Sequence, residues 1–166
     1  MTATEQTDVK DMVNLCTALY ICNIIAALTQ FSLYTSAFGI VVALCILIFA
    51  YIKRAEFRST MFESHFNWMI RSFWIGGSVY LPIVTIIGTG VFLYMSDLQK
   101  VIDASIEGEK DQTYLMALLY ESNAELLYNM MFVTVSLFAV WWTWRMLRGL
   151  VFILKQQPVT KVNSWI

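Results

Sequence analysis

The spacing of charged residues constrains this fold more than any other feature. No Asp, Glu, Lys, Arg or His occurs in the 41 residues from Met12 to Ile52. Two further uncharged runs cover the 25 residues 72–96 and the 19 residues 126–144. Because a helix needs roughly 20 apolar residues to cross a bilayer core, the first run can supply two spans and each of the others one. The sequence therefore predicts four transmembrane helices.

The composition is typical of a membrane protein. The chain is 58% hydrophobic and 14% charged, whereas soluble domains average about 45–50% apolar and about 25% charged residues. Residues 1–11 are polar and lack the basic region and cleavage motif of a signal peptide. We therefore expect an all-α integral membrane protein with a single membrane domain over residues 1–166. Its predicted segments are a cytoplasmic tail (1–11), span one (12–33), span two (36–52), an interfacial amphipathic helix (54–71), span three (72–95), an acidic outer helical segment (96–125), span four (126–150) and a cytoplasmic tail (151–166).

The basic residues are distributed unevenly over the two predicted faces of the membrane. One face receives nine of the eleven basic residues, which are Lys10, Lys53, Arg54, Arg58, Arg71, Arg145, Arg148, Lys155 and Lys161. The opposite face receives only Lys100 and Lys110. It also receives seven of the twelve acidic residues, which are Asp97, Asp103, Glu107, Glu109, Asp111, Glu121 and Glu125. Because basic loops tend to stay in the cytoplasm, both termini are predicted to be cytoplasmic and the acidic segment to lie outside.

Span three contains residues that affect helix geometry. Pro82 removes a backbone hydrogen bond and is expected to bend the helix. The Gly76–Gly77 pair allows a neighbouring helix to approach closely. A broken helix can also mark the binding site of a transporter, although a packing kink is the commoner origin of such a pattern. Within the acidic segment, apolar residues recur at helical spacing on both sides of Gly108 and predict two helices separated at that glycine.

No set of residues predicts a metal or cofactor site. Cys16, Cys22 and Cys45 lack metal-ligand spacing, so we expect three buried small hydrophobic side chains without disulfides. Glu121 and Glu125 lie one helical turn apart, and paired carboxylates can bind a cation or perform acid–base chemistry. A solvated acidic helix face explains this pair better, because no further ligand lies nearby in the sequence.

The stretch ESHFNWMIRSFW, residues 63–74, is the most polar and aromatic part of the apolar region. On a helix, Glu63, Asn67 and Arg71 share one stripe and can satisfy one another, while an aromatic stripe lies beside them. The fourth span ends in a second basic and aromatic edge, WWTWRMLRGL. The candidate interface or lipid-headgroup residues of the two edges are Glu63, His65, Asn67, Trp68, Arg71, Trp74, Trp141, Arg145 and Arg148.

Three uses fit these candidate residues. They can hold anionic lipid headgroups, at roughly 1 kcal/mol per basic residue near the surface, or they can dock a protein partner. His65 could instead shuttle protons, because the pKa of histidine can be near neutrality. A proton path needs further ionisable groups inside the spans, and the predicted uncharged runs contain none. No nucleophile–base pair is present in the sequence, so we expect no catalytic site.

Several of these motifs resemble a known family. ESHFNWMIRSFWIGG resembles the segment S-H-[FY]-[RK]-[FW]-Q-I-R-T-F-W of small bacterial membrane proteins akin to the Tic-twenty-like family. The preceding YIKRAEF, the ending WWTWRMLRGLVFILKQQPV and the final NSWI also resemble family features. His65, Arg71, Arg145 and Gly149 occupy the matching motif positions. The chain departs from the pattern at Asn67 and Met69, where relatives often carry Arg or Lys and Gln, and the acidic segment is longer than the usual connection.

The resemblance implies a four-helix bundle in the bacterial inner membrane and no established catalytic residue. It also connects the chain to plastid relatives associated with protein import. We expect a non-enzymatic accessory or scaffold subunit of a larger membrane complex. The alternative is a transport or protein-translocation component that acts as an oligomer. The expected partners are membrane lipids with anionic headgroups and a membrane protein or a second copy of the chain, with no nucleic acid.

Overall fold

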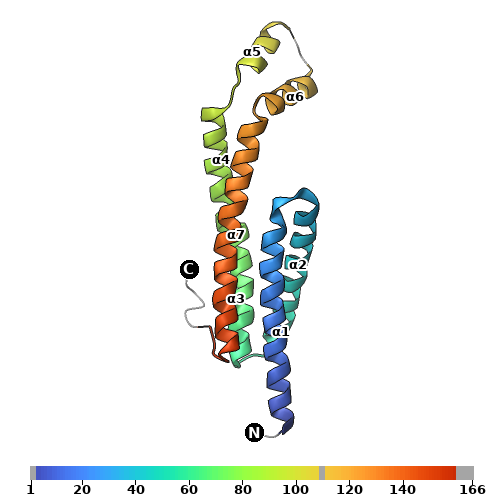
Figure 1. Ribbon diagram of the computed structural model, residues 1–166, viewed down its shortest axis with the longest axis vertical. Helices are drawn as coiled ribbons and strands as arrows, with labels where there is room; N and C mark the ends of the chain where they lie inside the picture. Colours follow the sequence, from blue (N-terminus) through green and yellow to red (C-terminus); the bar gives the residue numbers. More distant parts are fainter. Residues whose placement is uncertain (1–2, 109–110, 160–166) are drawn as a thin grey trace. The chain divides into compact units, whose positions relative to one another are not determined.

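The computed structural model describes residues 3–108 and 111–159, which are helical with no strand in these ranges. Figure 1 shows the helices in chain order. Their bounds are α1 Ala3–Leu28, the 3-10 turn η1 Thr29–Phe31, α2 Leu33–Glu56, α3 Met61–Ile75, the π turn η2 Gly76–Tyr80, α4 Leu81–Met95, α5 Gln99–Ile106, α6 Gln112–Ser122 and α7 Ala124–Leu154. The predicted sites at Glu109, Lys110, Lys161 and the terminal NSWI lie outside the described residues.

Four helical stretches are long and apolar enough to cross a membrane. They are Val9–Phe31, Thr35–Glu56, Met61–Met95 and Ala124–Leu154. This confirms the prediction of an all-helical chain with four candidate membrane spans. The chain divides into two compact units, residues 1–81 with 135–166 (unit 1) and residues 82–134 (unit 2).

A tight turn joins α1 to α2 in unit 1. The hydroxyl of Thr35 donates to the carbonyl of Thr29 over 2.6 Å. A Cβ at Gly39 would lie 2.6 Å from Gln30 Nε2 and 2.8 Å from the carbonyl oxygen of Ala26. Only glycine allows α2 to approach the end of α1 this closely, because any larger residue would overlap the turn. Polar side chains also hold the turn, since Thr29 Oγ1 and Gln30 Nε2 both donate to the carbonyl of Ala26.

The segment predicted as a separate interfacial helix, residues 54–71, has different boundaries in the structure. α2 continues through Arg54 to Glu56, and the chain bends at residues 57–60, where Ser59 has a left-handed φ of 66°. α3 then begins at Met61 and is continuous with the candidate span that ends at Met95. α3 packs against other helices because its apolar stripe is stabilised when it is buried and removed from water. Eight residues of α3 are buried, namely Phe62, His65, Phe66, Trp68, Met69, Ile70, Ser72 and Ile75.

A π turn separates α3 from α4. The N–H of Leu81 bonds to the carbonyl of Gly76, five residues earlier. The turn ends two residues before Pro82, which has no N–H to donate and whose ring crowds the carbonyl four residues before it. A Cβ at Gly76 would meet the rings of Phe138 and Trp142 of α7 at 3.2 and 3.3 Å, whereas Gly77 has open space around it. Close helix approach thus occurs at the first glycine of the pair only.

The core of unit 1 combines aromatic and small side chains. Cys16, Tyr20, Phe66 and Met146 are each 0% exposed. Of the three cysteines, only Cys16 is buried, and Cys22 and Cys45 are exposed. The prediction of three buried cysteines is therefore wrong for two of them, because those two positions lie on outward faces of α1 and α2.

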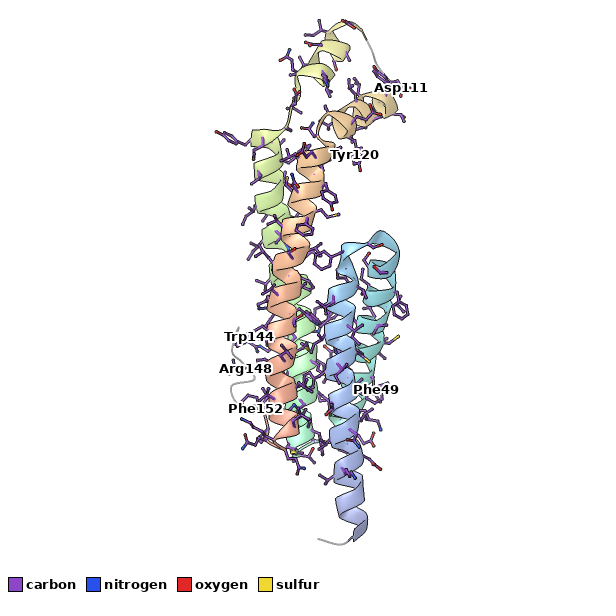
Figure 2. All side chains as sticks on the ribbon, viewed as in Figure 1. Phe49, Asp111, Tyr120, Trp144, Arg148 and Phe152 are labelled. Atoms are coloured by element: carbon purple, nitrogen blue, oxygen red, sulfur yellow. The ribbon has the colours of Figure 1, made fainter. Side chains whose placement is uncertain are left out.

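Unit 2 contains the acidic segment, whose two ends are tied together. The Oδ1 atom of Asn123 accepts a hydrogen bond from the N–H of Asp97 (2.7 Å), and its Nδ2 atom donates to the carbonyl of Asp97 (3.2 Å). Asn123 is 4% exposed. Between these ends, α5 stops before Gly108, whose φ is +96°, and the Asp111 carboxylate caps α6 by accepting from the N–H of Thr113. Figure 2 shows Asp111 and Tyr120 near the two ends of α6.

Candidate functional site

The polar residues of α3 lie on two different faces of the helix. One set is buried and bonds to α1, α7 and the segment after α7. We call this set the polar interlock, and it consists of Tyr20, His65, Trp68, Ser72 and Arg145. The other set borders an open pocket and is described below as the basic pocket. Both belong to unit 1.

His65 connects three parts of the chain. Its Nε2 atom lies 3.0 Å from the carbonyl oxygen of Gln157, and its Nδ1 atom lies 3.0 Å from the Tyr20 hydroxyl. Because a carbonyl can only accept, Nε2 carries the hydrogen, and in the neutral imidazole Nδ1 then accepts from Tyr20. The side chain is 0% exposed. Both nitrogens are therefore used to hold α1 and the C-terminal segment against α3.

Arg145 of α7 binds α3 through its side chain and its backbone. Its Nε atom donates to the Ser72 hydroxyl over 2.6 Å, and that hydroxyl donates to the carbonyl of Trp68. The guanidinium carbon lies 3.9 Å from the centroid of the Trp68 ring, a cation–π contact. In return, the indole N–H of Trp68 donates to the backbone carbonyl of Arg145 over 3.0 Å. Each of the two large side chains thus fixes the position of the other.

Gly149 of α7 brings α1 into the same cluster. A Cβ on Gly149 would overlap the ring of Tyr20. The absence of a side chain therefore lets the phenol pass α7 and reach His65.

The segment after α7 folds back onto α3. Gln156 adopts a left-handed φ of 52°, and the N–H groups of Gln156 and Gln157 bond to the carbonyls of Ile153 and Phe152. This is the pattern of a Schellman motif, which ends a helix and reverses the chain. The N–H of Val159 then donates to the hydroxyl of Ser64 over 3.0 Å, and the Val159 side chain is 3% exposed.

The basic pocket lies beside the opposite face of α3. It is open and has a volume of about 690 Å³, within the range of roughly 300–1,000 Å³ typical of small-molecule sites. Its lining residues are Arg54, Thr60, Glu63, Ser64, Asn67, Ile70, Arg71 and Trp74. Two guanidinium groups and one carboxylate give these residues a formal net charge of +1. At one edge, the indole N–H of Trp74 donates to the Tyr51 hydroxyl over 2.7 Å.

The structure separates the predicted interface residues into distinct groups. Four of the nine border the basic pocket, namely Glu63, Asn67, Arg71 and Trp74. His65 and Trp68 are 0% exposed and Arg145 is 1% exposed, which differs from the expectation that they face headgroups. Both ring nitrogens of His65, the indole N–H of Trp68 and the Nε atom of Arg145 instead bond inside the protein, because a charged or polar group removed from water needs such partners.

The last two candidates, Arg148 and Trp141, are residues of α7 that do not line the basic pocket. Arg148 is half-buried with its guanidinium 5.6 Å from the Trp68 ring. Trp141 is half-buried and stacks on Tyr80 with a centroid distance of 6.4 Å and an interplanar angle of 6°. Figure 2 labels Arg148 between Trp144 and Phe152 on this helix.

Sequence reasoning did not single out several residues that complete both sites. The sequence places Tyr20 and Ser72 within spans one and three, and it places Arg54 at the start of the predicted interfacial helix without marking it as a binding residue. The helical spacing of Trp68 and Ser72, four residues apart, could have indicated that they share a face. The pairing of either residue with α7 depends on tertiary contacts and has no local signal.

Comparison of the chain with known proteins identifies no relative. The chain matches no protein-family model, no curated protein and no solved structure.

Proposed function

We propose that this chain is a non-enzymatic, multi-pass membrane protein that acts as an accessory or scaffold subunit of a larger membrane complex. In this proposal it resides in the bacterial inner membrane, and its four candidate spans anchor it with both termini in the cytoplasm. The uneven distribution of basic residues supports that orientation.

The observation that carries the proposal is the construction of the acidic segment. Asn123 bonds to both backbone groups of Asp97, so the two ends of the segment meet at one fixed base within unit 2. Between these residues, α5 and α6 expose large apolar side chains, including Ile106 (78%), Met116 (67%) and Tyr120 (65%). Apolar groups exposed among acidic residues on short helices are suited to dock a protein.

The polar interlock supports a structural role for unit 1. The hydrogen bonds described above for Tyr20, His65, Ser72 and Arg145 run to one another or to backbone carbonyls. These bonds join α1, α3, α7 and the C-terminal segment. Side chains used in this way fix helices relative to one another, as expected of a rigid anchor.

We also propose that the chain is related to the Tic-twenty-like family. Of the residues at matching motif positions, His65 and Gly149 both contact Tyr20, while Arg145 bonds to α3 two turns from His65. The contacts among these residues give a structural reason for the motif, and this supports the proposed relationship. They also suggest that the residues stabilise the fold.

Site-specific photo-crosslinking in native membranes tests the scaffold proposal. A photoreactive residue at Met116 of α6 should give one discrete heteromeric product. The matched control is Ile86 of α4, which is 73% exposed within a candidate span and should give lipid adducts. Products only between copies of the chain, combined with solute flux in proteoliposomes, would favour the oligomeric transport alternative. Equal products from both positions would contradict a docking role for the acidic segment.

A further inference from the structure

The basic pocket has the properties of a ligand site that is distinct from the polar interlock. Among its lining residues, Glu63 is engaged by the backbone N–H of Ser59 over 2.8 Å. Glu56, the nearest carboxylate along the chain to Arg54, is paired with Lys53 over 2.6 Å. Arg54 is exposed and has no ion-pair partner among the side chains that the structure describes. A guanidinium at the rim of an open pocket can bind an anion with two parallel hydrogen bonds.

We propose that the basic pocket binds the headgroup of an anionic phospholipid, with the phosphodiester between Arg54 and Arg71. The formal charge of +1 on the lining residues matches the single negative charge of a phosphodiester. A phosphate monoester would place up to two negative charges beside the Glu63 carboxylate, which disfavours it. Glu63 and Asn67 can instead bond to hydroxyl groups of a glycerol headgroup, since a carboxylate accepts and an amide does both.

The surroundings of the pocket favour a lipid over a free phosphate or an acidic peptide. Trp74, at 52% exposure, bonds to Tyr51 of α2 and joins the pocket to the outer face of that helix. On the same face, Ile48 and Ile52 are 60% and 63% exposed and lie one turn apart. Acyl chains leaving the headgroup would cover these residues, whereas phosphate or a charged peptide would leave them uncovered. Trp and Tyr also prefer the boundary between headgroups and acyl chains.

This inference requires only that the chain is embedded in a membrane, and it does not depend on docking through the acidic segment. Failure of lipid binding and failure of the photo-crosslinking experiment are therefore distinguishable. One concerns unit 1 and the other unit 2.

Native mass spectrometry of the full chain in mild detergent tests the proposal. Phosphatidylglycerol should be retained more strongly than phosphatidylcholine or phosphatidylethanolamine of the same chain length. Arg54→Gln should lower the affinity for phosphatidylglycerol about fivefold, the effect expected from roughly 1 kcal/mol per basic residue at a membrane surface. Arg54→Lys should recover part of this loss, because it keeps the charge without the planar fork. The matched control, Arg58→Gln, removes an exposed charge from the adjacent bend that does not line the pocket and should retain wild-type affinity.

Three results would overturn the proposal. Equal losses in the Arg54→Gln and Arg58→Gln variants would mean that total charge, and not the pocket, attracts the lipid. Displacement of the lipid by inorganic phosphate at equal concentration would identify a free phosphate as the ligand. Stronger binding of a glutamate-rich peptide than of phosphatidylglycerol would make the pocket a protein-docking site.

Discussion

The two faces of α3 carry similar side chains but differ in their surroundings. On one face, His65 and Ser72 are 0% exposed, and their polar atoms bond to α1, α7 and the C-terminal segment. On the other face, Asn67 and Arg71 border a pocket of about 690 Å³. A cation and an aromatic residue occur on both faces. Arg145 lies over the Trp68 ring on one face, and Arg71 and Trp74 both line the pocket on the other.

Burial separates the polar residues of α3 that hold the fold from those that can bind a ligand. A buried polar group is costly unless it is bonded, so the interlock must form for the bundle to fold. A polar group beside open space, such as the exposed Arg54 of the basic pocket, keeps water as a partner and costs little, so it remains available for a ligand. The interlock should therefore control stability, and the basic pocket should control binding.

Arg145→Ala should have the largest effect. It removes the bond to Ser72 and the contact with Trp68, and it leaves a cavity, so the free energy of unfolding should fall by about 3 kcal/mol. Reversible unfolding in mild detergent measures this loss. Arg148→Ala is the matched control, because its guanidinium lies 5.6 Å rather than 3.9 Å from the same ring, and it should cost about 1 kcal/mol or less. Equal losses of unfolding free energy in the two variants would show that the buried Arg145 contributes no more to stability than the half-buried Arg148.

Gly149→Ala should have the next largest effect. The added Cβ would overlap the Tyr20 ring, so α1 must move away from α7 or Tyr20 must leave His65, at a cost of about 1–3 kcal/mol. Thermal unfolding of the purified variant measures the change. Gly90→Ala in α4 serves as the control, since nothing lies within 4 Å of its added Cβ, and it should be neutral or stabilising. A stable Gly149→Ala variant would show that the interlock does not need this close approach.

The positions of the four spans could be predicted because they depend on composition along the chain. A bilayer requires long uncharged runs, and such runs are visible in any single sequence. The turn before Gly39, the π turn before Pro82 and the helix break at Gly108 also follow from local chemistry, since proline and glycine restrict or release the backbone locally.

The interlock could not be predicted, because it depends on which helix faces each side chain. His65 and Arg145 looked like headgroup ligands because each lies next to tryptophans and near a predicted membrane edge. Their partners, Tyr20 and Ser72, are 45 and 73 residues away in the chain. Periodicity shows that residues share a helix face, but it does not show which other helix covers that face.

The hydrogen bond between Tyr20 and His65 should give a measurable coupling energy. We expect Tyr20→Phe and His65→Phe each to destabilise the protein, and the double variant to be about 1 kcal/mol more stable than the sum of the single effects predicts. Unfolding of the wild type, both single variants and the double variant provides the four values. Additivity within about 0.3 kcal/mol would show that the two side chains are neighbours without a shared bond.

Gln156→Gly should stabilise the protein slightly. The left-handed conformation costs an L-residue roughly 1–2 kcal/mol, while glycine loses roughly 0.5–1 kcal/mol more conformational freedom on folding. The expected net gain is about 0.5 kcal/mol, measured as a higher midpoint of unfolding. Gln157→Gly is the control, because Gln157 does not have a positive φ and should gain nothing. A loss in the Gln156→Gly variant would indicate that the C-terminal segment does not end α7 in this geometry.

Arg54→Gln should have the smallest effect on the unliganded protein, because Arg54 is exposed and surface substitutions usually stay within about 0.5 kcal/mol. Added phosphatidylglycerol should then separate the two proteins. A ligand that binds only the folded state stabilises it in proportion to its affinity, so the wild type should gain more stability than the variant at the same lipid concentration. Arg145→Ala should behave in the opposite way, with a large loss without lipid and an undiminished relative gain with it. If Arg54→Gln were as destabilising as Arg145→Ala in the absence of lipid, both faces of α3 would serve the fold, and the basic pocket would be a gap in packing.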